Sequence, residues 1–273
     1  MGLSMDNVAV RASSLPGLFD CPARWEATHI RGLRMPTSDK AALGKAVHAS
    51  TAVFDQSNLD GSGITAEEAK AAAVDAIHHP DEETVWEEMT PTEAESIALG
   101  LHAKYCATVA QEQTYAAVEV TCNALEISDL GLVLTGTTDR IRKVTDDLGR
   151  TRYGISDLKT GKTAVGTDGI AKTQGHAFQL GVYELLAQAA SGVPITAPAQ
   201  IIGMNTAKTE KSQRIGIGEV DRAREVLLGD GEVPGVLENA SRLIHSGMFF
   251  GNPRSMLCNA RYCPIFNTCQ FRK

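Results

Sequence analysis

One segment, residues 136–183, constrains the structure of this chain more than any other part of its sequence. It contains the strand-like run Gly136-Thr137-Thr138-Asp139 and, further on, the strand-like run Ile155-Ser156-Asp157-Leu158-Lys159-Thr160-Gly161. Side chains two residues apart on a strand lie on the same face, so Asp157 and Lys159 should point into one cleft. The order of these groups, with Asp139 on a neighbouring strand, predicts a site for metal-dependent chemistry on a phosphodiester.

The 273-residue chain has ordinary apolar and charged fractions for a globular protein. It has no run of about 18 apolar residues and does not begin with a basic stretch followed by an apolar one, so we expect neither a membrane span nor a secretory signal. We therefore expect it in the cytoplasm of a bacterial cell, or of the host cell if a phage encodes it. The net charge of −7 argues against nonspecific coating of nucleic acid. It does not argue against a nuclease, because a bound divalent metal supplies positive charge locally.

Capping signals and apolar spacing predict helices over most of the first third of the chain. Thr65 followed by Glu68, and Thr90 followed by Glu93, have the spacing of a capping box at a helix start. After residue 114, alternating apolar residues and turn sequences predict an antiparallel meander of three strands. The expected helices cover 13–33, 39–56, 65–79, 90–113, 173–191 and 219–246, the last interrupted near 229–234, and the expected strands cover 118–127, 132–144, 152–160, 198–205 and 212–218.

Two aspartates offer the ligands that phosphodiester hydrolysis needs. The reaction requires a metal ion to polarise the phosphoryl oxygen, a nucleophilic water, and neutralisation of the charge that develops. Mg or Mn prefers oxygen ligands, which Asp139 and Asp157 supply, and the backbone carbonyl of Leu158 is a plausible further ligand. Lys159 is suited to orient or help deprotonate the attacking water, or to stabilise the pentacovalent phosphate.

Asp139, Asp157, Leu158 and Lys159 match the core motif of the PD-(D/E)XK nuclease superfamily, and the following Thr160-Gly161-Lys162 resembles its RecB-type branch. This branch, of the helicase-nuclease and CRISPR-associated kinds, has two further motifs that the chain resembles. Gln179 and Tyr183, spaced i and i+4 on one helical face, are similar to the Gln-xxx-Tyr motif that positions the substrate strand near the metals. Leu43-Gly44-Lys45-Ala46-Val47-His48 resembles the upstream helix whose histidine is a metal ligand, which implies that role for His48.

The resemblance implies an α/β fold with a restriction-endonuclease-like core, in which helices flank a central mixed β-sheet. We expect a single domain over residues 1–273, with a mainly helical region at 14–113, the catalytic sheet core at 114–218, and a carboxy-terminal helix with a cysteine cluster at 219–273. The implied activity is Mg- or Mn-dependent cleavage of DNA, by an exonuclease acting on single strands or DNA ends in recombination, repair or replication. A helicase or recombination protein is the implied partner, and the oligomeric state is left open.

Each of these residues also has a simpler interpretation. Asp157 and Lys159 alone would be an ion pair on the solvated face of a strand. His48 alone would be a core histidine. Glu119 is left out of the ligand set, because Val118 and Val120 around it give the alternation of a half-buried strand. For the whole chain the alternatives are a catalytically silent DNA- or helicase-binding subunit of the same fold, and a zinc-stabilised structural protein.

Four cysteines have a placement of their own. Cys258, Cys263 and Cys269 lie within the last sixteen residues, and Cys21 lies near the amino terminus. Together they supply the four thiolates that an iron-sulphur cluster requires. RecB-type nucleases carry a 4Fe-4S cluster with this one-plus-three arrangement, and Arg261-Tyr262-Cys263-Pro264 resembles their carboxy-terminal signature. Such a cluster would join the two ends of the chain.

The first spacing departs from that pattern, since four residues separate Cys258 from Cys263 where many relatives have two. Zinc held by the same thiolates is the alternative to the cluster, and reduced cysteines that merely pack are the simplest interpretation. Cys106 and Cys122, in a predicted helix and strand, are expected to be small buried residues. The basic residues that would follow a DNA backbone, or form ordinary surface, are Arg140, Arg142, Lys143, Lys162, Lys172 and Arg254.

Overall fold

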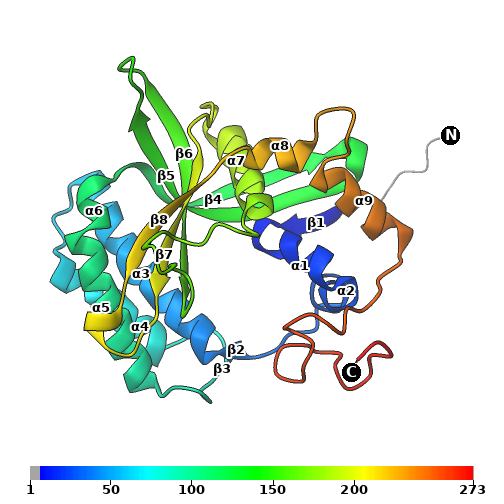
Figure 1. Cartoon of the computed structure of the whole chain (residues 1–273), viewed down its shortest axis with the longest axis horizontal. Helices are drawn as coiled ribbons and strands as arrows, with labels where there is room; N and C mark the ends of the chain where they lie inside the picture. Colours follow the sequence, from blue (N-terminus) through cyan, green and yellow to red (C-terminus); the bar gives the residue numbers. More distant parts are fainter. Residues whose placement is uncertain (1–6, 273) are drawn as a thin grey trace.

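The structure is a computed structural model, and it describes residues 7–272. Its centre is a mixed six-stranded sheet with the order β1-β5-β6-β7-β8, to which β4 adds by pairing with β5 (Figure 1). The strands β1 and β5 pair in parallel, as do β6 and β7, and the other pairs are antiparallel. The strands are β1 (Val8–Arg11), β4 (Thr114–Ile127), β5 (Leu132–Thr145), β6 (Thr151–Gly161), β7 (Ala199–Asn205) and β8 (Ile215–Val220).

Strand β5 has two partners along one of its edges. Its first four residues pair with β1, and its residues 140–145 pair with β6, while β4 occupies the opposite edge. Among the residues that the structure describes, none pairs as a strand with residues 136–139 on the edge that β1 and β6 share. Asp139 lies at this fork, directly before the pairing with β6 begins.

Helices cover both faces of the sheet. On one face, the helices α3 and α5 pack through Leu43 and Leu101 on Leu158 of β6 and Ile202 of β7. The capping boxes predicted at Thr65 and Thr90 are both present. The helices of this layer are α3 (Asp39–Asp60), α4 (Ala66–His78), α5 (Pro91–Ala107) and α6 (Val109–Glu112), and the short strands β2 (Thr37–Ser38) and β3 (Thr84–Val85) pair beside them.

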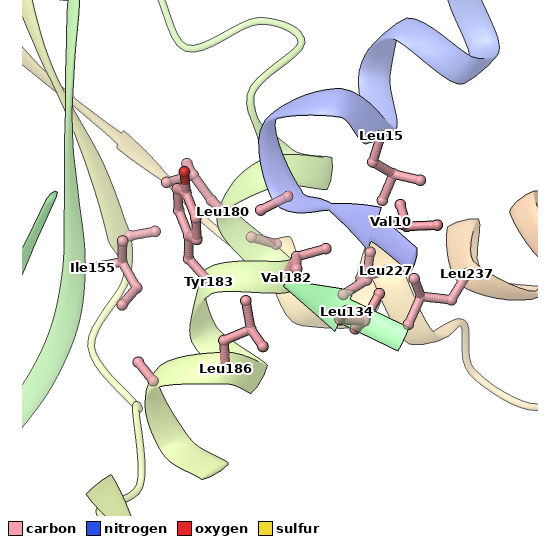
Figure 2. Packing of buried hydrophobic residues seen from close by; sticks show 14 of the residues in the cluster. Val10, Leu15, Leu134, Ile155, Leu180, Val182, Tyr183, Leu186, Leu227 and Leu237 are labelled. Atoms are coloured by element: carbon pink, nitrogen blue, oxygen red, sulfur yellow. The ribbon is translucent and has the colours of Figure 1, made fainter. Parts of the chain in front are cut away.

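The other face holds the second half of the core. Helix α7 places Leu180, Val182 and Leu186 among side chains from β1, β5 and β6, and Figure 2 shows this cluster around Leu134 and Ile155. The helices of this layer are α1 (Leu15–Asp20), α2 (Pro22–His29), α7 (Ala177–Ser191), α8 (Ala223–Leu228) and α9 (Val236–Ser246). The prediction of a mixed α/β fold with a central sheet flanked by helices is confirmed. In the part of the chain that the structure describes, no helix is both long and apolar enough for a membrane span.

Several element boundaries differ from the sequence predictions. The helix expected over 13–33 is divided into α1 and α2 at Cys21, whose backbone is extended with φ −150° and ψ 91°. The residue before a proline is disfavoured in the helical region, and Pro22 follows here. The helix expected to 113 ends at Ala107 and is followed by the separate turn α6. Strand β1 and the short pair β2–β3 were not predicted, because runs of two to four residues carry too little periodicity.

Candidate functional site

Three elements bring their polar groups together at the fork in β5. Asp139 Oδ2 accepts a hydrogen bond from the backbone N–H of Leu158, 2.8 Å away. His48 of α3 lies over the same point, with Nδ1 3.4 Å from Asp139 Oδ2 and Nε2 3.1 Å from the Leu158 carbonyl oxygen. The two sequence motifs that predicted His48 and Asp139 as neighbours are therefore adjacent in space, although 91 positions separate them.

A glycine sets the distance between α3 and the sheet. A Cβ atom on Gly44 would lie 2.9 Å from Thr160 Oγ1 of β6, closer than such contacts normally permit. The absence of a side chain lets α3 pack closely on β6 at this level. His48 is one helical turn further along α3, so this close packing brings its ring to the Leu158 carbonyl.

Asp157 and Lys159 share a face of β6, as the spacing predicted. Asp157 is 1% exposed, and its Oδ2 atom lies 2.7 Å from Lys159 Nζ. The direction of this contact does not meet hydrogen-bond geometry, so we treat it as an ion pair at short range. The simpler interpretation from the sequence was an ion pair on the solvated face of a strand. The ion pair is present, but the strand face is not solvated at Asp157, which is buried.

Helix α7 supplies the other neighbours of Asp157. The Gln179 amide nitrogen lies 3.0 Å from the Tyr183 hydroxyl and 3.4 Å from Asp157 Oδ1. The i, i+4 pair expected from the sequence thus contacts itself and reaches the carboxylate. Burial raises the pKa of Tyr183 well above its ordinary value, with the charges of Asp157 and Asp139 adding to the shift. The hydroxyl is protonated at neutral pH and is available as a hydrogen-bond donor.

The carboxylates at the fork interact unfavourably with one another. Burial and then the charge of Asp139 raise the pKa of Asp157 to about 6, and Lys159 and His48 only partly oppose this shift. A buried acid with an added like charge nearby is the arrangement that a bound cation relieves.

Glu119 belongs to this cluster, contrary to the sequence interpretation. One ligand atom each of His48, Glu119 and Asp139 lie within 4.8 Å of one another, and this is the one such group of three found among residues 7–272. Glu119 has φ of +48°, a left-handed conformation that is uncommon outside glycine, so the regular alternation through Val118 and Val120 is interrupted. Burial and then the charge of Asp139 also raise the pKa of Glu119. The sequence signal that could have found it is simply its acidic side chain opposite Asp139.

Two of the basic residues expected along a DNA path are buried instead. Arg140 is fully buried, with Nε 2.8 Å from Asp55 Oδ2 and Nη1 3.1 Å from Glu119 Oε1. Its Nη2 donates to Thr51 Oγ1, and Tyr105 donates to the same Asp55 oxygen. Arg142, also buried, donates to the Pro198 carbonyl and pairs with Glu219. Both expectations for these residues, a DNA contact and ordinary surface, are wrong, because residues 138–142 of β5 are buried on both faces of the strand.

A cleft of about 980 Å³ opens beside the cluster. It runs between α3 and α4, and His48, Glu119 and Lys159 line one part of its wall. Ser13, Thr37 and Lys45 line its other parts. His48, Glu119 and Lys159 therefore face a space large enough for a nucleotide chain.

The four cysteines expected to act together line one cavity. Cys21 is at the junction of α1 and α2, and the other three lie in the irregular segment after α9. Figure 1 shows this segment beside α2. The backbone N–H of Asn252 donates to Cys21 Sγ, and Ala23 N–H donates to the Phe250 carbonyl. Burial raises the pKa of Cys263, with the thiols of Cys21 and Cys269 contributing to the shift. Cys106 and Cys122 are buried elsewhere, as expected.

A forked mixed sheet with acidic side chains, an imidazole and a lysine at the fork defines the class of metal-dependent nucleic-acid hydrolases. The sequence matches the family model described as the PD-(D/E)XK nuclease superfamily over residues 10–270. The chain belongs to this superfamily, and membership implies a metal-dependent nuclease with DNA as substrate.

Comparison with solved structures gives a distant likeness to the one described as "Crystal structure of SSO0001". The two sequences are 15% identical, the match covers 94% of this chain and 97% of the other, and the TM-score is 0.36. Curated protein sequences give no match.

Proposed function

We propose that this protein is a Mg- or Mn-dependent deoxyribonuclease of the RecB type that acts as an exonuclease on single-stranded DNA or DNA ends. The observation that carries the proposal is the convergence of His48, Glu119, Asp139, Asp157 and Lys159 at the fork of the sheet in a chain of this superfamily. Its task would be processing of ends in recombination, repair or replication, in the cytoplasm and beside a helicase or recombination protein.

The donor set fits a hard divalent cation. Carboxylate oxygens and a backbone carbonyl are the ligands that Mg and Mn prefer, and one imidazole is compatible with Mn. Asp139, Asp157, His48 and the Leu158 carbonyl would hold the ion, with Glu119 as a further acidic group. The raised pKa of Asp157 supports this assignment, because the carboxylates crowd one another where a cation would sit. When bound, such an ion polarises the phosphoryl oxygen and lowers the pKa of water.

The residues of the chain have separate tasks in this proposal. The Lys159 ammonium, 2.7 Å from Asp157 and lining the cleft, orients the attacking water and neutralises charge that develops on the phosphate. The protonated Tyr183 hydroxyl and the Gln179 amide hold the substrate strand against the fork. Leu158 N–H fixes the Asp139 carboxylate so that it needs little reorganisation.

We also propose that Cys21, Cys258, Cys263 and Cys269 hold a 4Fe-4S cluster. The supporting observation is that all four thiols line one cavity, although they come from opposite ends of the sequence. Zinc held by the same four thiolates is the alternative. Arg24 and Arg272 also line this cavity, and their positive charge suits an anionic thiolate cluster.

A nuclease assay tests the proposal. Labelled single-stranded and duplex DNA are incubated with Mn, with Mg, or with chelator, using the wild type, Asp157→Asn, and Asp147→Asn as a matched change in an exposed turn. We expect degradation of the single strand that requires metal, survives in Asp147→Asn, and is lost in Asp157→Asn. Binding without cleavage in the wild type would instead support the silent subunit, and cleavage that persists in Asp157→Asn would assign the activity to a contaminant.

The cluster has its own test, in the colour and metal content of the purified protein. Brown protein with about four iron atoms per chain is expected. Stoichiometric zinc in colourless protein purified without oxygen would contradict the cluster and leave the nuclease proposal intact.

A further inference from the structure

A second polar cavity lies beside the catalytic cleft, and its wall is basic. Three arginines from separate segments line it, namely Arg11 at the end of β1, Arg24 in α2 and Arg34 in the loop before β2. Tyr262, from the cysteine-bearing carboxy-terminal segment, lines the same cavity. The chain carries a net charge of −7, so a local gathering of three arginines runs against its overall composition.

In the part of the chain that the structure describes, these arginines have no carboxylate partner. Within residues 7–272, none of the three guanidinium groups lies within 4.0 Å of an acidic oxygen, although most other arginines of the chain are paired in this way. The Nε atom of Arg24 is buried and has no hydrogen-bond partner. All three guanidinium charges act on His29. Burial lowers the pKa of His29, and the charges of Arg34, Arg24 and Arg11 lower it further. The three charges are therefore close together, and no acidic side chain among residues 7–272 pairs with them.

Two acidic residues complete the cavity wall. Glu82 is already engaged, since Lys45 Nζ and Thr37 Oγ1 each lie 2.8 Å from its Oε2. Glu83 also lines the cavity. With Lys45 neutralising Glu82, the arginines leave a positive surplus that favours an anion.

The ring of Tyr262 contacts the guanidinium group of the preceding residue. The Arg261 guanidinium lies 5.4 Å from the centre of the Tyr262 ring. Arg261 is itself fixed by Asp39, 3.2 Å away at the start of α3, and by Glu87 and Glu88. The ion pairs order Arg261, and the Tyr262 ring beside it lines the cavity, where a planar group could stack on it.

The basic cavity adjoins the cleft that His48, Glu119 and Lys159 line. Thr37 lines both of them. Ser13 lines the catalytic cleft and also a smaller hollow that it shares with Arg24 and Thr28 of the basic cavity. Ser13 and Thr37 therefore lie between the fork and the three arginines, where a strand extending from the cleft would pass.

We propose that Arg11, Arg24, Arg34 and Tyr262 form a single-stranded DNA subsite, in which the arginines bind successive backbone phosphates and Tyr262 stacks on a base of the strand whose end lies in the catalytic cleft. The proposal rests on the proposed function, because it takes the same substrate. Phosphate binding by arginine with stacking on an aromatic ring is the general chemistry of single-strand recognition without sequence preference. It also gives the cysteine segment a task beyond joining the chain ends, since this segment carries Tyr262.

The test is the salt dependence of binding to a fluorescent oligothymidylate, followed by anisotropy in chelator so that no cleavage occurs. The variants are Arg11→Gln, Arg34→Gln, the double variant, Tyr262→Ala and Tyr262→Phe, with Arg150→Gln in the exposed β5–β6 turn as the charge-matched control. Each lost phosphate contact should reduce the slope of log affinity against log salt by about 0.7. Tyr262→Ala should weaken binding about 5- to 100-fold, and Tyr262→Phe should retain most of the affinity.

Iron content and melting temperature are measured for each variant, because Tyr262 precedes a cysteine. Arg11 and Arg34 do not line the cysteine cavity, so their variants keep the test independent of the cluster. The subsite is overturned if the slope of log affinity against log salt changes as much in Arg150→Gln as in the arginine variants, or if it does not change in the double variant. It is also overturned if the wild type fails to bind the oligonucleotide. Normal binding slopes with no cleavage in Mn would leave the subsite standing and reject the nuclease proposal.

Discussion

The two candidate metal centres of this protein are built in contrasting ways. At the fork of the sheet, the ligand candidates come from regular elements, with Asp139 fixed by a backbone N–H and Asp157 between Lys159 and Gln179. In the cysteine cavity, three of the four thiols lie in a segment that has neither helix nor strand. The side chains of the first centre are positioned by strands and helices, whereas the proposed cluster would add metal–sulphur bonds to a segment that has neither.

This difference predicts that the two centres fail differently. Loss of the ion at the fork should remove chemistry and leave the fold, because the sheet and helices there have their own apolar cores. Loss of the cysteine-bound centre should first loosen the structure near the termini, and activity should fall as a consequence. The changes below separate these outcomes, starting with the largest effect expected.

Asp157→Asn should reduce the rate of DNA cleavage by about 10³-fold or more, because a charged metal ligand becomes a neutral amide at the reacting centre. The melting temperature measured without metal should stay unchanged or rise, since the substitution removes repulsion from Asp139. Single-turnover cleavage and a thermal melt check the two parts. A melting temperature that falls in parallel with activity would show that Asp157 is structural.

Arg140→Met should destabilise the protein by about 3–5 kcal/mol, because it leaves the buried Asp55 carboxylate without its partner. Denaturant unfolding measures this loss, and Lys143→Met, an exposed change on the same strand, is the control. An unfolding free energy close to that of the control would contradict the burial of this pair.

Cys263→Ser should lower the melting temperature by about 5 °C or more and reduce the iron content, because the loss of one thiolate weakens the centre that joins the chain ends. Cleavage should fall by a smaller factor than in Asp157→Asn, and Cys122→Ala, in β4 outside the cavity, should keep its iron. An unchanged melt together with an unchanged cleavage rate would count against the contrast between the centres.

The affinity for Mn should fall as the pH is lowered through about 6, approaching a tenfold loss per pH unit, because a proton on Asp157 competes with the ion. The stability of the fold without metal changes with pH in the opposite direction. The pKa of Asp157 is higher in the folded protein than in the unfolded chain, so in chelator its contribution makes the fold more stable as the pH falls from about 6 toward 4. Calorimetric titration with Mn and melts in chelator measure both, and Asp157→Asn should abolish this component.

Glu119→Gln should have the smallest effect, a roughly tenfold weaker affinity for Mn. The Glu119 carboxylate is partly exposed, and its ion pair with Arg140 already offsets part of its negative charge. Titration of Mn into the variant measures it. An unchanged affinity would limit Glu119 to its role as a partner of Arg140.

The contrast between regular elements and irregular segments also explains which features the sequence could predict. The strands around Asp139 and Asp157 and the helix of Gln179 and Tyr183 follow from alternation and helical spacing, whereas their meeting at one site was implied by the resemblance to the nuclease superfamily. The sequence did not predict the burial of Arg140, because its partners Asp55 and Thr51 lie on helix α3, far from Arg140 in the sequence. Glu119 was missed because its positive φ breaks a pattern that is regular in the sequence. The basic cavity joins residues from both chain ends, and no local pattern links them.

The most direct test of the account is anomalous diffraction from crystals grown with Mn. We predict a manganese peak at the fork of the sheet, within bonding distance of a carboxylate oxygen of Asp139 and one of Asp157, and next to His48. A fully occupied manganese peak elsewhere, with Asp157 still paired to Lys159 and no density at the fork, would contradict it.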